Sequence, residues 1–323
     1  MERTELLAAQ KLFGVPEEFF EEANAMVKES EWILILAMGP DPVPEKELEK
    51  KVLEAGLAWS APDFIRECYH RAVINKVPRE EGMYWQINSF YGRFPYFAQY
   101  ERYEYGKFPK EVKEALNRWD FEVYLGIYGD DVRMKMQGID THVHNSDYLT
   151  LEEAFAFVDR HADECGFQPC NCKAMMYYHD RPVDVCLIFE TGPNSEMDRG
   201  HGTHVTAEEA KKRLLQANRK GLMQNGEDYA ICNCDGYCCY PLQMARACGS
   251  RGIYPKSHYS IVWDEEKCIQ CGKCTKICNF GAFSRGEDRK VGFDPEKCWG
   301  CTICSANCPV QAITLVPETK GQS

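Results

Sequence analysis

The sequence predicts an α+β protein composed of several domains, and three observations support this class. Its 323 residues are enough for two or three domains. Segments with helical spacing and a strand-like segment both occur near the N-terminus. The eighteen cysteines are unevenly distributed, because only Cys68 precedes residue 120, whereas residues 264–323 contain eight. We therefore expect an N-terminal region over 1–120, a cysteine-rich α/β middle region over 121–260 and a third region over 261–323.

The N-terminal region is predicted to contain three helices followed by a strand. An apolar run over Glu31–Met38 predicts the first helix, and a second extends from Pro44 to about Ala55. A third helix begins near Ser60, and the run Met83–Ile87 has the composition of a strand. This is the element order of a winged-helix domain, so we expect a winged-helix-like docking or scaffold domain here.

Aromatic side chains are concentrated in residues 91–149, where no clear helical spacing is visible. We expect a packed connector in this segment. The alternative, a flavin or substrate pocket, has no support in the sequence. No phosphate loop and no G-x-G-x-x-G motif occur in the chain.

The middle region contains two groups of cysteines, each preceded by a predicted helix. Thr150 and Thr206 each begin a capped helix, and Cys-Asn-Cys follows each helix in a predicted turn. The candidate metal ligands are Cys170, Cys172, Cys186, Cys232, Cys234, Cys238 and Cys239. A third iron–sulfur cluster, a structural zinc ion and no metal are the three interpretations. Adjacent cysteines cannot easily both bind one ion, so some of the seven must be spare. The isolated Cys68, Cys165 and Cys248 are expected in the core.

The last region contains one cysteine motif twice. The pattern C-x2-C-x2-C-x3-C over Cys268–Cys278 recurs over Cys298–Cys308, thirty residues later. Three thiolates at this spacing can converge on one cubane, whereas the fourth cysteine points away from it. Zinc is the alternative, but zinc sites rarely need eight thiols in a doubled spacing. We expect two [4Fe–4S] clusters, which would also stabilise a segment too short to bury a large core.

This doubled motif resembles that of bacterial-type two-cluster ferredoxins. The resemblance implies that each cluster takes three cysteines from one motif and the fourth from the other. The two implied ligand sets are Cys268, Cys271, Cys274 and Cys308 for one cluster, and Cys298, Cys301, Cys304 and Cys278 for the other. The sequence departs from that family at Asn279, which stands where these ferredoxins usually have proline, so the turn after Cys278 is expected to differ.

Most of the chain also resembles a family of iron–sulfur proteins from anaerobic bacteria and archaea. Its members look like a winged-helix N-terminal region, a cysteine-rich middle region and a C-terminal two-cluster ferredoxin. The matching stretches in the middle region are Cys170-Asn171-Cys172, Asp184–Leu187, Lys220-Gly221-Leu222, Ile231–Cys234 and Cys238-Cys239. This resemblance implies an architecture and no defined reaction.

Composition limits where the protein acts. The chain has no run of about 18 apolar residues and no apolar signal segment after its charged N-terminus, so we expect a cytoplasmic protein without membrane insertion. In a reducing compartment, clustered cysteines more often bind metal than form disulfides. His201 and His204 could offer imidazoles to a metal, but a solvated loop is the expected role of this segment.

The predicted function is electron transfer: a protein or subunit that relays low-potential electrons between redox partners in anaerobic metabolism. The expected partner is a redox protein, such as a flavoprotein or another oxidoreductase subunit. The alternatives are a redox-sensing winged-helix regulator and a reductive activase of a corrinoid or radical enzyme. The net charge is −12, and residues 41–80 hold eight acids and seven bases. Because a DNA-reading face needs clustered Lys and Arg, we expect no binding to nucleic acid.

Overall fold

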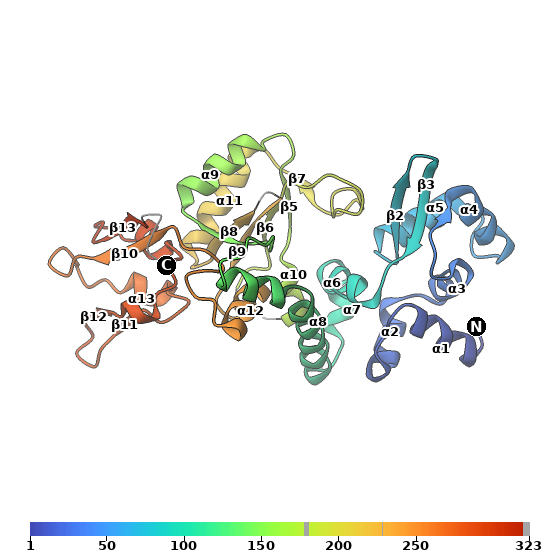
Figure 1. Cartoon of the computed structure of the whole chain (residues 1–323), viewed down its shortest axis with the longest axis horizontal. Helices are drawn as coiled ribbons and strands as arrows, with labels where there is room; N and C mark the ends of the chain where they lie inside the picture. The colour runs from blue at the N-terminus through green and yellow to red at the C-terminus, as the bar shows by residue number, and fades with distance from the viewer. Residues whose placement is uncertain (178–180, 228, 319–323) are drawn as a thin grey trace. The chain divides into compact units, whose positions relative to one another are not determined.

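The computed structural model of the chain describes residues 1–177, 181–227 and 229–318 (Figure 1). These residues form two compact units. The N-terminal unit comprises Met1–Asp120, Ala174–Tyr177 and Glu190–Gly202, and the second comprises Phe121–Lys173, Tyr178–Phe189 and Thr203–Ser323. Within the described residues, no helix combines the length and apolarity that crossing a membrane requires.

The N-terminal unit contains a three-stranded sheet with strand order β1-β3-β2, accompanied by helices. Its elements up to the connector are α1 (Arg3–Leu12), η1 (Glu17–Phe19), α2 (Phe20–Met26), α3 (Glu29–Met38), β1 (Val43–Pro44), α4 (Glu45–Glu54), α5 (Ala61–His70), β2 (Ile74–Arg79) and β3 (Gly82–Ile87). The three predicted helices are present as α3, α4 and α5, and the predicted strand is β3. Strands β1 and β2 were not predicted, because both contain proline, which weakens the signal of a strand.

The expected connector over residues 91–149 is largely helical, which its spacing did not predict. It contains α6 (Phe90–Tyr100), α7 (Arg102–Gly106), the 27-residue α8 (Lys110–Met136) and a strand of the second unit, β4 (Asp147–Leu149). The buried stripe of α6 includes Arg93, which pairs with Glu101, and the helix contains Pro95. A buried charge and an internal proline therefore hide the helical period of this segment.

A segment from the middle of the chain completes the N-terminal unit. Residues 190–202, here called the strap, lie against β2. The Lys76 N–H donates to Asn194 Oδ1 over 2.8 Å, and Asn194 Nδ2 donates to the Lys76 carbonyl over 2.9 Å. Arg199 is buried and donates to the Tyr69 carbonyl over 2.6 Å. Paired hydrogen bonds of this kind cap the free edge of a strand, so the strap protects the outer edge of this sheet.

His201 lies in a loop but is half-buried, so the expectation of a solvated loop was wrong for this side chain. Its ring stacks on His70 with a centroid separation of 4.0 Å and on Tyr100 with 3.8 Å. Its Nε2 lies 2.6 Å from the His70 carbonyl, to which an Nε2–H tautomer donates. His204, in contrast, is exposed in the two-residue strand β7 (Thr203–His204).

The second unit is built on a six-stranded sheet with strand order β4-β8-β9-β6-β5-β7. Its further elements are α9 (Leu151–Arg160), β5 (Gly166–Pro169), α10 (Asn171–Met176), β6 (Asp184–Ile188), α11 (Ala207–Arg219), β8 (Met223–Glu227), β9 (Ala230–Cys234) and α12 (Tyr240–Cys248). Both predicted helix starts are present, with the Thr150 and Thr206 hydroxyls accepting from the backbone of Glu153 and Glu209. The strand pairings of this sheet are antiparallel, so the expected α/β class of the middle region was wrong. An α/β sheet is mostly parallel, whereas an antiparallel sheet with its helices on one face is typical of the α+β class.

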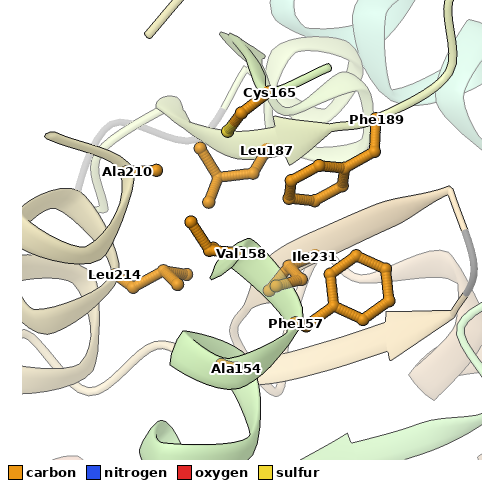
Figure 2. Packing of buried hydrophobic residues seen from close by; sticks show 9 residues of the cluster. All are labelled: Ala154, Phe157, Val158, Cys165, Leu187, Phe189, Ala210, Leu214 and Ile231. Atoms are coloured by element: carbon orange, nitrogen blue, oxygen red, sulfur yellow. The ribbon is translucent and has the colours of Figure 1, made fainter. Parts of the chain in front are cut away.

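The two faces of this sheet differ in chemistry. One face packs on α9 and α11 through an apolar core of Ala154, Phe157, Val158, Cys165, Leu187, Phe189, Ala210, Leu214 and Ile231 (Figure 2). Side chains alternate between the faces of a strand, so Cys232 lies on the opposite face from Ile231. On that face Cys232 is opposite Asn225, and Asn225 is opposite Tyr148. Cysteines are therefore concentrated on the face away from α9 and α11.

Two small antiparallel ribbons form the C-terminal module. Its elements are β10 (Tyr259–Trp263), α13 (Lys273–Ile277), β11 (Phe283–Arg285), β12 (Val291–Phe293), η2 (Pro295–Lys297), α14 (Ile303–Ala306) and β13 (Ile313–Pro317). Strand β10 pairs with β13, and β11 pairs with β12 (Figure 1). Its small core contains Phe283, Val291 and Ile313 together with Cys304. Such a core is small for a folding unit, and half-buried cysteines pack against it.

Candidate metal centres

The two cysteine motifs lie in loops whose backbone repeats itself after thirty residues. Left-handed backbone occurs in three pairs: Gln270 and Gly300, Gly272 and Thr302, and Gly281 and Gln311. Non-glycine residues adopt this conformation rarely, so three matching pairs indicate that one loop shape occurs twice in the molecule. Such turns expose backbone N–H groups on the inside of a loop, where they can receive an anion.

In both halves a backbone N–H points at a cysteine sulfur. Gln270 donates to Cys268 Sγ over 3.4 Å, and Gly300 donates to Cys298 Sγ over the same distance. These donors stabilise a thiolate more than a thiol, because hydrogen bonds to an anion are stronger than those to a neutral acceptor.

The first motif shares a cavity with the last cysteine of the second motif. Cys268, Cys271, Cys274 and Cys308 all line this cavity. The N–H of Ala312 donates to Cys308 Sγ over 3.2 Å and holds that sulfur in place. The structure thus brings Cys308 to the first triplet.

The second triplet has Cys278 as its neighbour and is more deeply buried. Burial raises the pKa of the Cys298, Cys301 and Cys304 thiols, and the Cys278 sulfur raises each further. Cys301 and Cys304 are 8% and 7% exposed, whereas Cys271 of the first motif is exposed. The structure therefore brings together both ligand sets implied by the ferredoxin resemblance, and the ligand assignment itself stays a prediction.

All eight cysteines are free of disulfides. Buried thiols with raised pKa values stay protonated without metal, and iron binding displaces their protons. Two four-thiol sets with N–H donors fit two [4Fe–4S] clusters. Loops, ribbons and thiols together define an iron–sulfur protein of the two-cluster ferredoxin class.

Comparison with known proteins agrees with this class. Residues 261–315 match the family of 4Fe-4S dicluster domains. The pyruvate synthase subunit PorD of Methanocaldococcus jannaschii is 42% identical over 59 residues, which are 18% of this chain and 69% of that protein. The archaeal-type glutamate synthase of Thermotoga maritima is 42% identical over 53 residues, which are 16% of this chain and 10% of that enzyme. One of the chains of the selenate reductase from Mesobacillus selenatarsenatis is 45% identical over 50 residues, which are 15% of this chain and 17% of that one.

Through this segment the chain belongs to the 4Fe–4S dicluster ferredoxin family. The segment spans only a small part of the glutamate synthase and selenate reductase chains. No solved structure matches the chain significantly. The family membership therefore defines the iron–sulfur module and its role in electron transport, and leaves residues 1–260 to be interpreted from their own structure.

Six of the seven candidate cysteines in the middle region form one group. We call Cys170, Cys172, Cys186, Cys232, Cys234 and Cys239 the six-thiol group. Hydrogen bonding with Cys172 and Cys186 lowers the pKa of Cys170 well below the ordinary value. Hydrogen bonding with Cys186 and Cys234 has the same effect on the pKa of Cys232, and the single thiol proton of Cys186 is shared between Cys170 and Cys232. Cys239 is the sixth member of the group, and its Sγ lies 3.3 Å from Cys234 Sγ.

The seventh candidate, Cys238, is turned away from this group. Its Sγ lies 3.2 and 3.1 Å from the two carboxylate oxygens of Asp235, to which it donates. Adjacent Cys238 and Cys239 thus have different partners. Cys232-Asn233-Cys234 lies on strand β9 rather than in the expected turn, because Cys232 and Cys234 pair in register with β8.

A buried cation accompanies the six-thiol group, which sequence reasoning missed. Lys173 is 1% exposed, and its Nζ donates to the Asn233 carbonyl over 2.7 Å and lies 3.8 Å from Cys170 Sγ. Burial opposes its charge, but the Cys170 and Cys238 sulfurs raise its pKa well above the ordinary value. The only signal in the sequence was its position next to Cys172, and lysine after cysteine is too common to be informative.

Proposed function

We propose that this protein transfers electrons between redox partners by means of two [4Fe–4S] clusters. Cys268, Cys271, Cys274 and Cys308 would hold one, and Cys298, Cys301, Cys304 and Cys278 the other. The observation that carries this proposal is the cavity in which Cys308 joins the first triplet. Crossed ligation of this kind places two clusters close to each other, and a bound cluster supplies a one-electron site whose potential depends on hydrogen bonds and exposure.

The exposure of the residues around the two sites indicates which site a redox partner would contact. At the first site Cys271 and Ile269 are exposed, the latter to 60%. At the second site Cys301 and Cys304 are buried. An external redox protein can approach the first site closely, whereas the second is shielded by protein. We infer that a partner docks at the loop around Ile269.

The N-terminal unit serves as a docking domain in this proposal, with a winged-helix-like fold. Support comes from its element order and from the surface of α5, the helix that would face DNA in a winged-helix regulator. That surface carries Asp63 and Glu67, and its Arg66 pairs with Asp63 over 3.0 Å. An acidic helix favours a protein partner over nucleic acid. The three relatives described above are named as oxidoreductases or their subunits, which favours an oxidoreductase as that partner.

A reductive titration of the anaerobically purified full chain tests the proposed function. We expect at least about eight irons per chain and at least two one-electron reductions, each with the electron paramagnetic resonance signal of a reduced [4Fe–4S] cluster. About four irons, or clusters that accept no electron within roughly −700 to +450 mV, would contradict it. The Cys308→Ser variant is the matched control, since it changes one ligand and leaves the N-terminal unit untouched.

A further inference from the structure

The six-thiol group collects sulfurs from four separate segments of the chain. Cys170 and Cys172 lie where β5 meets α10, Cys186 lies on β6, and Cys232 and Cys234 lie on β9. Cys239 immediately precedes α12. None of the six forms a disulfide, and five of them are buried. Bringing six unlinked thiols together requires coordinated placement of four segments, which isolated core cysteines do not require.

Two polar side chains beside this group lack any partner. The amide nitrogen and oxygen of the Asn225 side chain and the hydroxyl of Tyr148 are buried without a hydrogen bond among the described residues. Asn225 lies opposite Cys232 on the neighbouring strand, and Tyr148 lies opposite Asn225. An unsatisfied buried group costs about 1–3 kcal/mol, so the two donors at this place, Asn225 Nδ2 and the Tyr148 hydroxyl, indicate an acceptor that the chain does not supply.

The charges beside the group are compatible with an anionic occupant. The Lys173 ammonium is fixed by the Asn233 carbonyl and lies 4.0 Å from the buried carboxylate of Asp235. That carboxylate also accepts from the Cys238 thiol. A buried cation is stable next to negative charge, and a metal–thiolate assembly would add to the charge of Asp235.

We propose that the six-thiol group binds a third iron–sulfur cluster, with Cys238 outside the ligand set and Asn225 Nδ2 as a hydrogen-bond donor to it. Inorganic sulfide and thiolate are acceptors that Asn225 Nδ2 and the Tyr148 hydroxyl otherwise lack. This inference goes beyond the proposed function, which needs only the two clusters of the ferredoxin module.

Zinc fits this arrangement less well than an iron–sulfur cluster. A zinc ion takes four ligands with Zn–S bonds of about 2.3 Å, so its sulfurs must all converge on one point. Among the described residues, no group of three or more Cys, His, Asp or Glu side chains is arranged to hold a single metal ion. The same is true of the ferredoxin cysteines, as expected of ligands that surround a larger cluster.

The site also adjoins the second ferredoxin set. Tyr148 belongs to one apolar core with Cys234, Cys239 and Cys301. Met223 and Ile277 complete the contact between the two sets of thiols in the same core. The second unit would thus place a third redox centre beside the buried end of the ferredoxin module.

Metal analysis of the full chain tests the third site. We expect about twelve irons in the anaerobically purified protein and about eight in a Cys186→Ala/Cys232→Ala variant. Two matched controls, Cys238→Ala and Cys165→Ala, should keep about twelve, because Cys165 lies in the apolar core of Figure 2. About eight irons in the unchanged protein, with or without zinc, would overturn this proposal and leave the two-cluster function intact. Fewer than eight would instead contradict the proposed function.

The Asn225→Leu variant gives a second measurement that keeps all thiols. Loss of an N–H···S hydrogen bond makes reduction harder, so one of three reduction potentials should become more negative while the iron content is unchanged. The potentials of the two clusters assigned by the Cys308→Ser and Cys278→Ser variants should not move. If all three potentials match those of the unchanged protein, Asn225 is not a hydrogen-bond donor to the cluster and that part of the proposal is wrong.

Discussion

Asn279 joins the ferredoxin module to the middle region through Gly221. Its Nδ2 donates to the Gly221 carbonyl over 2.9 Å, and its Oδ1 accepts from the Gly236 N–H over 3.1 Å. A Cβ at Gly236 would lie 2.6 Å from the Asn279 carbonyl oxygen, so only glycine permits this approach. Proline, which two-cluster ferredoxins usually have here, offers neither hydrogen bond. The departure from the ferredoxin pattern therefore has a structural reason: this module is attached to another part of the chain.

Replacing Asn279 by proline should loosen this attachment and leave the iron content unchanged. Two hydrogen bonds are lost, each worth about 0.5–1.5 kcal/mol, while the eight cysteines keep their positions. Hydrogen exchange at the Gly236 amide should accelerate in Asn279→Pro. The Asn279→Asp variant keeps the acceptor, so its Gly236 amide should stay protected. Equal protection in both variants would show that Asn279 does not hold the module.

Gly300→Ala should weaken the second ferredoxin site. Gly300 has a φ of +66°, and a Cβ there would lie 1.9 Å from Ser257 Oγ. The left-handed backbone alone costs about 1–2 kcal/mol for alanine, and the clash moves the N–H that donates to Cys298. We expect faster iron release to a chelator from the site of Cys298. Gly292→Ala is the control, because nothing lies within 4 Å of its added Cβ and its φ is ordinary. Equal release rates in the two variants would contradict this.

Local patterns were predictable from the sequence, and long-range ones were not. The spacing of Cys268, Cys271 and Cys274 specifies a loop by itself, because three thiols within seven residues have few ways to converge. The six-thiol group depends instead on the pairing of β6, β8 and β9, which no spacing along the chain encodes. Asn225 and Lys173 gave no signal, since their importance depends on neighbours that are distant in the sequence. Helix α8 was missed because few of its residues are buried.

The full chain should not bind DNA selectively at physiological salt. Its net charge is −12, and Arg66 on α5 is engaged by Asp63. Affinity for DNA comes largely from contacts of Lys and Arg with phosphates, which an acidic surface cannot supply. Electrophoretic mobility shifts with a genomic fragment library should show no sequence-selective complex. A nanomolar, selective complex that weakens steeply with salt would instead favour the regulator hypothesis.

Acidification should release the strap from the N-terminal unit. The pKa of His201 is lowered to about 4, chiefly by burial; the His70 carbonyl raises it, and the His70 ring and the charges of Arg199 and Arg93 contribute to the lowering. At pH values between this lowered pKa and the ordinary histidine pKa of about 6.5, His201 binds a proton when the strap is released but not when the strap is docked. Docking is therefore most stable above about pH 6.5 and weakens as the pH falls toward 4.

Hydrogen exchange at Lys76 measures this release, because its N–H donates to Asn194 of the strap. Protection, corrected for the intrinsic rate, should decrease between pH 7 and pH 5. The His201→Phe variant keeps a stacked ring without a titrating group, so its protection should depend less on pH. The same pH dependence in both proteins would assign the effect to another group, such as Asp198, whose pKa is lowered by Lys76 and Tyr69 against the effect of burial.

Serine in place of Cys308 should damage the cluster of the first motif and spare the one nearest to Cys308 in sequence. Cys308 lines the cavity of Cys268, Cys271 and Cys274, whereas Cys278 lies with the second triplet. Serine oxygen is a harder and poorer ligand for this iron than thiolate, so the affected cluster should become labile or lose one iron. Cys278→Ser should give the reciprocal pattern. Electron paramagnetic resonance of each reduced variant should show one altered signal, and the altered signal should differ between the two.

Transfer to a redox partner should fall in both variants, because each relay has lost one centre. If Cys308→Ser keeps both clusters at unchanged potentials, the crossed ligand assignment is wrong. If both variants transfer electrons at the full rate, the clusters are structural and the electron-transfer function fails.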